Sequence, residues 1–175
     1  MSIKDYFRKS ALKKCGTSPT SILPLSKIST AVALIDVEDP SFDECKQSLM
    51  SFFRANNIKG EIFFFDFRKI ISGERLITSI TNTILKKDTN WYGRPSSEKL
   101  ALFDSLQEPD VLISLLPYDS FTAEFTARYC KARFKIGRLR LPGNVFDLVV
   151  ADPSGNPLSE AESFQAIKTI LDKIQ

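Results

Sequence analysis

Short apolar runs rich in β-branched residues alternate with amphipathic segments along most of the chain. The first run is Thr30–Val37, and apolar residues then recur at helical spacing from Phe42 to Phe53. A continuous apolar run of this length is typical of a strand buried on both faces of a parallel sheet. Parallel neighbours need a crossover, which a helix usually supplies. The alternation therefore predicts an α/β fold: a doubly wound, mainly parallel, Rossmann-like sheet of five or six strands with helices on both faces.

The same pattern predicts the remaining elements. Further strands are expected at Gly60–Phe67, within Leu76–Ile84, and at Asp110–Pro117, Ala132–Gly137 and Phe146–Asp152. Helices are expected at Ile3–Lys14, Ser41–Asn57, Ser97–Leu106, Phe121–Cys130 and from Ser159 onward, with a short helix or turn at Arg68–Arg75. Capping-box patterns pair Ser41 with Glu44 and Ser159 with Glu162. Numbered along the chain, the strands suggest the order 3-2-1-4-5-6.

The length and composition fit one folded unit behind a basic arm. With 175 residues, of which 43% are hydrophobic and 26% charged, the chain can bury a sizeable core. We expect a basic N-terminal helix and connector at residues 1–28 and a single α/β domain at residues 29–175. No apolar run approaches the roughly 18 to 20 residues that span a bilayer or resembles a secretory signal, so we expect a cytoplasmic protein. Cys15, Cys45 and Cys130 form no CxxC pair and are interpreted as reduced thiols.

Missing residue types and motifs argue against several chemistries. The chain has no histidine, which removes the commonest general base and metal ligand and every Ser-His or Cys-His arrangement. The first predicted strand is followed by EDPSFDECK, which has no glycine and would repel a pyrophosphate, and no GxxxxGK[ST] sequence occurs. We therefore expect no NAD, FAD or P-loop ATP chemistry, no cofactor and no metal. A nucleotide held in another way is left open.

Aspartates follow several of the predicted strands, where ligands of open parallel sheets bind. The aspartates at strand ends are Asp36, Asp66, Asp119 and Asp152. If the first and fourth strands are neighbours, Asp36 and Asp119 flank the crevice, and two carboxylates there could share a proton or hold a metal ion. The alternative, which we favour, is that these aspartates cap helices and stabilise turns.

The segment KKDTNWYGRPSSEKL, residues 86–100, contains the only tryptophan of the chain. Trp91, Tyr92 and Arg94 are candidate ligand-binding residues, because aromatic rings stack on ligands and a guanidinium contacts anions. In the alternative interpretation, which we favour, Trp91 and Tyr92 pack against the sheet while Gly93 and Pro95 set the turn.

The N-terminal arm carries most of the excess positive charge. Residues 1–27 hold six basic residues against Asp5 alone, a net charge of +5, while the whole chain carries +3. The basic residues of the arm helix are Lys4, Arg8, Lys9, Lys13 and Lys14. We expect this helix to dock on its own domain; the alternatives are an anionic membrane surface, a nucleic acid or a protein partner.

Several of these segments together resemble a small uncharacterised bacterial family of about this length. The resemblance rests on KKDTNWYGRP and on KARFKIG combined with FDLVVAD, covers nearly the whole chain, and implies no particular activity. In addition, DVLISLLPYDSFTAEFTARYCKARFKIG is similar to the stretch of heptosyltransferase-type glycosyltransferases in which DLxIDL leads through a helix to AKxRIG. That similarity implies the N-terminal, Rossmann-like half of such an enzyme, although Ser114 stands where the pattern prefers aspartate.

Three functional hypotheses follow, and they leave open whether the protein is an enzyme. The first, which we favour, is a non-catalytic binding or interaction domain. The second is a glycosyltransferase-like or nucleotide-binding half-domain that needs a partner to complete it. The third is a peripheral contact with a membrane or a nucleic acid through the basic N-terminal helix.

Overall fold

Six strands form one parallel sheet in the part of the chain that the structure describes. The structure is a computed structural model and describes residues 2–17, 19–69 and 77–174. The order of the strands is β3-β2-β1-β4-β5-β6, and every neighbouring pair is parallel. The strands are β1 (Thr30–Asp36), β2 (Lys59–Asp66), β3 (Thr83–Leu85), β4 (Val111–Ser114), β5 (Phe134–Gly137) and β6 (Leu148–Val149). The predicted fold class and strand order are both confirmed.

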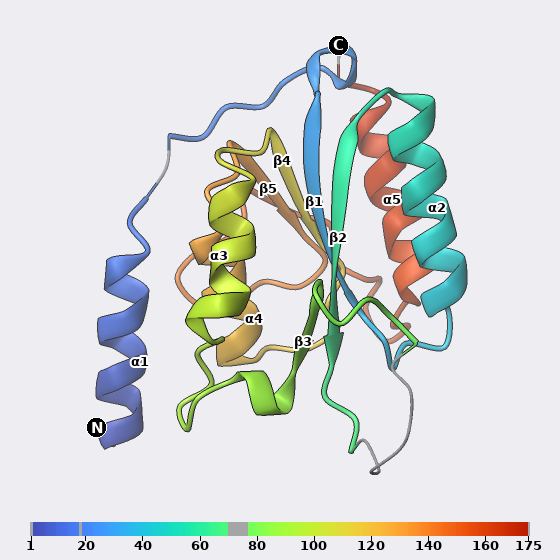
Figure 1. Ribbon diagram of the computed structural model, residues 1–175. Helices are drawn as coiled ribbons and strands as arrows, with labels where there is room; N and C mark the ends of the chain where they lie inside the picture. The colour runs from blue at the N-terminus through green and yellow to red at the C-terminus, as the bar shows by residue number, and fades with distance from the viewer. Residues whose placement is uncertain (1, 18, 70–76, 175) are drawn as a thin grey trace.

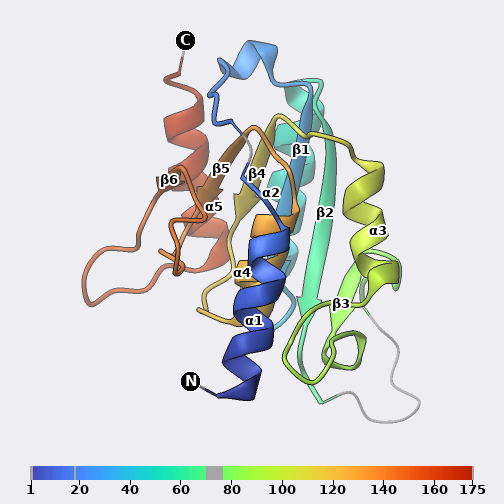
Figure 2. The same cartoon turned by 90° about the vertical axis from the view of Figure 1, so that its left-hand side faces the viewer.

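Helices cover both faces of this sheet (Figure 1). One face carries α2 (Phe42–Ala55) and α5 (Glu160–Leu171), and the other carries α3 (Ser97–Ser105) and α4 (Phe121–Tyr129). The N-terminal helix α1 (Ile3–Lys14) lies outside α4, as the turned view in Figure 2 also shows. Short 3-10 helices occur at Leu25–Lys27 and Lys86–Asp88. Among the described residues, none of these helices is long and apolar enough to cross a membrane.

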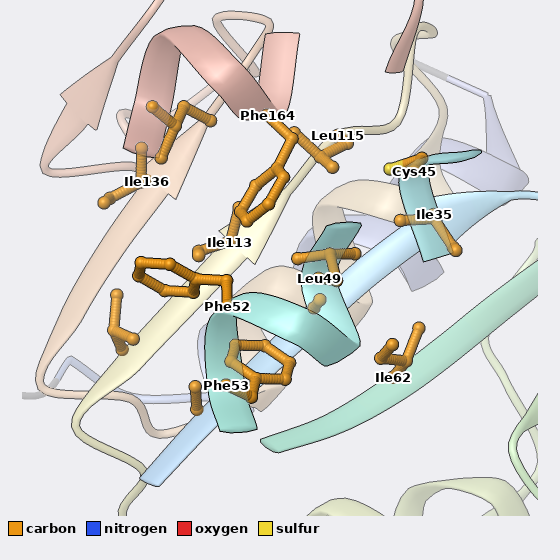
Figure 3. Packing of buried hydrophobic residues seen from close by; sticks show 14 of the residues in the cluster. Ile35, Cys45, Leu49, Phe52, Phe53, Ile62, Ile113, Leu115, Ile136 and Phe164 are labelled. Carbon is orange, nitrogen blue, oxygen red and sulfur yellow. The ribbon is translucent and has the colours of Figure 1, made fainter. Parts of the chain in front are cut away.

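The sheet separates two cores, because successive side chains of a strand point to opposite faces. In β1, Ala33 and Ile35 belong to the core under α2 and α5, whereas Val32 and Leu34 belong to the core under α3 and α4. Figure 3 shows the first core, in which Phe52, Phe53 and Leu49 of α2 meet Phe164 of α5 above Ile113 of β4. Strand β1 is thus buried on both faces, as its unbroken apolar run predicted.

One predicted capping box is present and the other is not. At the start of α5, the Ser159 hydroxyl accepts a hydrogen bond from the Glu162 N–H (3.3 Å), and the Glu162 carboxylate accepts one from the Ser159 N–H (2.8 Å). The prediction at Ser41 was wrong, because its hydroxyl donates to Asp39 (2.7 Å) and accepts from the Ala161 N–H (3.0 Å) instead. The loop after β1 therefore caps α5, far away in the sequence.

The two edge strands are shorter than predicted. The third strand was expected within Leu76–Ile84, but β3 begins only at Thr83, and the last strand, expected at Phe146–Asp152, is reduced to Leu148–Val149. An edge strand pairs on one side only, so its pairing ends where its single neighbour turns away. The helix or turn expected at Arg68–Arg75 lies largely outside the described residues.

Asp110 ties the amino ends of β1 and β4 together. Its Oδ2 accepts hydrogen bonds from the N–H groups of Ser29 (2.9 Å) and Thr30 (3.0 Å) and from both of their hydroxyls. Burial alone would raise the pKa of Asp110, but these donors outweigh it, so the pKa lies below its ordinary value. The ionised form therefore stabilises the folded state.

We expect Asp110→Asn to lower the free energy of unfolding by about 1–2 kcal/mol at pH 7, because charge-assisted hydrogen bonds are lost. This stabilisation is present above the unfolded pKa and is lost as the pH falls through the lowered folded pKa. The difference between variant and wild type in urea unfolding should therefore close below about pH 4. Glu108→Gln, at a nearby exposed carboxylate, is the control and should match wild type. A difference for Asp110→Asn that persists at low pH would contradict this account.

Candidate functional site

The N-terminal helix docks on its own domain, as expected. Ala11 and Leu12 of α1, with Cys15 just after it, pack with Phe125 and other aromatic residues of α4 in a third, smaller hydrophobic cluster. Arg8 fastens the same contact, because its Nε–H donates to the Tyr92 carbonyl (2.9 Å) and its guanidinium lies 4.9 Å from the centre of the Phe121 ring. The other arm cations, Lys4, Lys9, Lys13 and Lys14, are exposed.

A tight turn presents Trp91, Tyr92 and Arg94 toward this helix. The Asn90 side-chain oxygen accepts hydrogen bonds from the N–H groups of Tyr92 (3.2 Å) and Arg94 (2.9 Å). Gly93 has a φ of +96°, which favours glycine, and its carbonyl accepts from the Thr122 hydroxyl of α4 (2.7 Å). The Asn90 hydrogen bonds and Gly93 thus determine the conformation of the loop, and the hydrogen bond from Thr122 attaches the loop to α4.

A groove of about 410 Å³ opens between α1, this loop and α4; we call it the aromatic groove. Its lining residues are Phe7, Ser10, Ala11, Lys14 and Cys15 from α1 and its end, Tyr92 and Arg94 from the loop, and Phe125 and Tyr129 from α4. The Arg94 guanidinium lies 5.6 Å from the centre of the Phe125 ring. The lining contains two cations, Lys14 and Arg94, and no carboxylate. The aromatic groove is therefore suited to apolar or aromatic groups that carry negative charge.

Exposed apolar side chains extend this surface beside the groove. Ile3, Tyr6 and Trp91 are 74%, 60% and 61% exposed, and Phe7 is 43% exposed. The Trp91 ring lies 5.4 Å from that of Phe7, centre to centre, and 5.3 Å from that of Tyr92. The interpretation that Trp91 and Tyr92 pack against the sheet was therefore wrong: they pack on α1, and Tyr92 is half-buried between α1 and α4.

The predicted aspartates lie elsewhere and do not join the aromatic groove. Strands β1 and β4 are neighbours, as the two-carboxylate hypothesis required, but Asp36 is buried at the end of β1 while Asp119 is exposed before α4. Asp36 Oδ1 accepts the Glu38 N–H (3.0 Å), a turn contact of the favoured kind. Among the described residues, no group of three or more acidic or cysteine side chains could hold a metal ion.

The other two strand-end aspartates form ion pairs. Asp66 pairs with Arg68 (2.8 Å), and Asp152 pairs with the buried Arg138 (2.9 Å). The Arg68 hydrogen bond lowers the pKa of Asp66. Both aspartates are thus held as ionised partners of arginines.

The ligand-binding residues predicted from the sequence do not include the residues of α4 and α1 that line the groove. Phe121, Phe125 and Tyr129 recur every four residues, so one helix face carries three rings, and this spacing was the available signal. Lys14 was named only as one of the basic residues of the arm helix, without a link to this loop. Cys15 also lines the groove, but burial raises its pKa, so its thiol stays protonated and unreactive at neutral pH.

The fold defines the class: a doubly wound α/β protein with an all-parallel sheet, here with a basic helix docked on one side. The chain belongs to the family of unknown function DUF6913, whose model matches residues 1–170. This confirms the resemblance to an uncharacterised family of about this length. No curated protein and no solved structure matches the chain. The similarity to heptosyltransferases accordingly stays a prediction.

We expect Arg8→Ala to loosen α1 while leaving the sheet intact, because the variant loses one hydrogen bond and one cation–π contact. A local loss of about 1.4 kcal/mol would make the amides of Ile3–Lys14 exchange with solvent about tenfold faster. Hydrogen exchange measures this directly, with the amides of β1 as an internal reference. Lys13→Ala, at an exposed position of the same helix, should leave the rates unchanged. Equal rates in Arg8→Ala and wild type would show that Arg8 does not fasten the helix.

Proposed function

We propose that the protein is a non-catalytic interaction domain that binds an acidic, aromatic-containing segment of a partner protein in the aromatic groove. The observation that carries this proposal is the position of two cations, Lys14 and Arg94, among aromatic walls in a concavity of about 410 Å³. A carboxylate of the partner would pair with these cations while a neighbouring ring enters between Tyr92 and Phe125. The three free cysteines fit a reducing compartment, which supports action in the cytosol.

The residue types around the groove support a protein partner. Tryptophan, tyrosine and arginine are the residues that most often dominate binding energy at protein interfaces. Trp91, Tyr92 and Arg94 lie together on a loop that hydrogen bonds already hold, so little conformational entropy is lost on binding. The exposed Trp91 ring would be covered at the rim of such an interface.

The shape of the surface favours a chain segment over a bilayer. A peripheral helix lies on a bilayer with a continuous apolar face directed outward. In α1, by contrast, Ala11 faces α4, and Lys14 lines a concave groove together with aromatic rings. A membrane or a nucleic acid is therefore kept as an alternative outcome of the experiment below.

Trp91 is the only tryptophan, so intrinsic fluorescence reports directly on this surface. Short peptides in which glutamates flank one phenylalanine should shift the emission of Trp91 to shorter wavelength in a saturable way, because the ring leaves water. The matching lysine peptides should not. Arg94→Glu and Lys14→Glu should each weaken binding by at least about tenfold, since an attraction becomes a repulsion.

Two control variants separate this effect from general changes of charge or surface. Arg140→Glu reverses an exposed charge outside the groove, and Met50→Ala removes an exposed apolar side chain from α2; both should bind like wild type. Anionic vesicles and duplex DNA complete the series. If either of them shifts the Trp91 emission and the acidic peptides do not, the proposed protein partner is wrong.

A further inference from the structure

A second set of polar groups lies at the carboxyl ends of β1 and β4. These strands are neighbours, and the chain leaves them in opposite directions along the sheet, toward β2 and toward β5. In open parallel sheets, ligands bind beyond the strand ends at this point. The groups found here are Asp36 at the end of β1, Tyr118 after β4 and Glu160 at the start of α5.

Glu160 is fully buried, and only one of its two carboxylate oxygens accepts a hydrogen bond from the described residues. Its Oε1 accepts the Asp36 N–H (2.6 Å), and its own N–H donates to Asp39 (3.2 Å). Its Oε2 is buried and has no hydrogen-bond partner among the described residues. A buried oxygen without a partner costs about 1–3 kcal/mol, so native proteins rarely keep one without a reason.

The hydroxyl oxygen of Tyr118 is a second buried polar atom without a hydrogen-bond partner among the described residues. Burial raises the pKa of Tyr118, and the charges of Asp36, Glu160 and Glu38 raise it further. Tyr118 follows β4, which pairs in parallel with β1, so it lies at the same end of the sheet as Asp36. The remaining part of the Tyr118 side chain is half-buried, next to Phe67.

The surroundings of these oxygens are acidic. The buried cation Arg138 is engaged by Asp152 (2.9 Å) and by the Leu158 carbonyl. Asp36 accepts the Glu38 N–H through Oδ1, and its second oxygen accepts no hydrogen bond from the described part of the chain. At this end of the sheet, Glu160 Oε2 and Tyr118 Oη are thus buried in an acidic environment without a donor among the described residues.

We propose that this group of oxygens binds the ammonium group of a small primary amine. An ammonium ion has three N–H donors and no acceptor, which matches Glu160 Oε2, Tyr118 Oη and the second oxygen of Asp36. An anion would be repelled by Asp36, and a neutral hydroxyl has only one donor for three oxygens. The amine's carbon chain would leave past the half-buried Tyr118 ring.

Proton linkage gives this site a specific signature. Burial raises the pKa of Glu160 to about 9; the hydrogen bond from the Asp36 N–H and the charge of Arg138 oppose the increase, and the charges of Asp39 and Asp36 add to it. The Glu160 charge in turn raises the pKa of Cys45 of α2 and of Tyr118. Glu160 must therefore release a proton to accept an N–H. Amine affinity should rise by about tenfold per unit from pH 6 toward pH 9, where an alkylammonium is still charged.

The probe is ethylammonium chloride, with tetramethylammonium chloride as a control that carries the charge without N–H donors. In amide NMR spectra of the full chain, ethylammonium should shift the Asp36 and Glu160 signals in a saturable way, more strongly at pH 8.5 than at pH 6.5. Tyr118→Phe should weaken binding several-fold, and Glu160→Gln should weaken it and abolish the pH dependence. Glu44→Gln, at an exposed carboxylate of α2, should behave like wild type.

Other results of the same experiments would contradict the proposed ammonium site. No shift with ethylammonium, or equal shifts with tetramethylammonium, would overturn the proposal. Tyr118→Phe that melts at a lower temperature and binds no less amine would show that the hydroxyl serves an internal water network only. If Glu160→Gln does not fold, the affinity of Tyr118→Phe and the wild-type pH profile decide the matter. Binding in the aromatic groove is read separately from Trp91 fluorescence, so the two proposals fail independently.

Discussion

The double burial of β1 is the constraint on which the rest of the structure depends. Its side chains alternate between two cores, and its backbone pairs in parallel with β2 on one side and β4 on the other. Because its neighbours are both parallel, each connection must cross over a face and bring a helix with it. The chain crosses from β1 toward β2 but from β4 toward β5, so right-handed crossovers place α2 and α4 on opposite faces, and the carboxyl ends of both strands point to one edge.

Two distinct surfaces arise from this arrangement. On the outside, α4 offers a stripe of rings that receives the basic helix α1, and the Trp91 loop closes the aromatic groove between them. At the strand ends, the Asp36 N–H donates to Glu160 at the start of α5, and Tyr118 follows the neighbouring strand β4. The first surface is open, aromatic and cationic, whereas the second is buried and acidic. They therefore suit ligands of opposite charge.

The start of α5 carries one buried and one exposed glutamate, Glu160 and Glu162. Asp39 and Ser41 cap α5 across the molecule, which fixes the loop after β1 but leaves Glu160 directed inward beside Asp36. An acidic residue in the first turn of a helix is ordinarily an exposed partner of the helix dipole, as Glu162 is. Glu160 differs because the packing of α5 on the sheet removes it from water.

The sequence by itself determined the fold class, the strand order and the places of the long elements, because apolar periodicity and turn residues act locally and consistently. It also marked Trp91, Tyr92 and Arg94 as worth attention and predicted that α1 would dock. Only the tertiary structure decided that Lys14 and Arg94, eighty residues apart, share one groove, and that Glu160 meets Asp36. Contacts between residues so far apart in the sequence depend on how the helices pack across the sheet, and a local pattern of residues does not predict that packing.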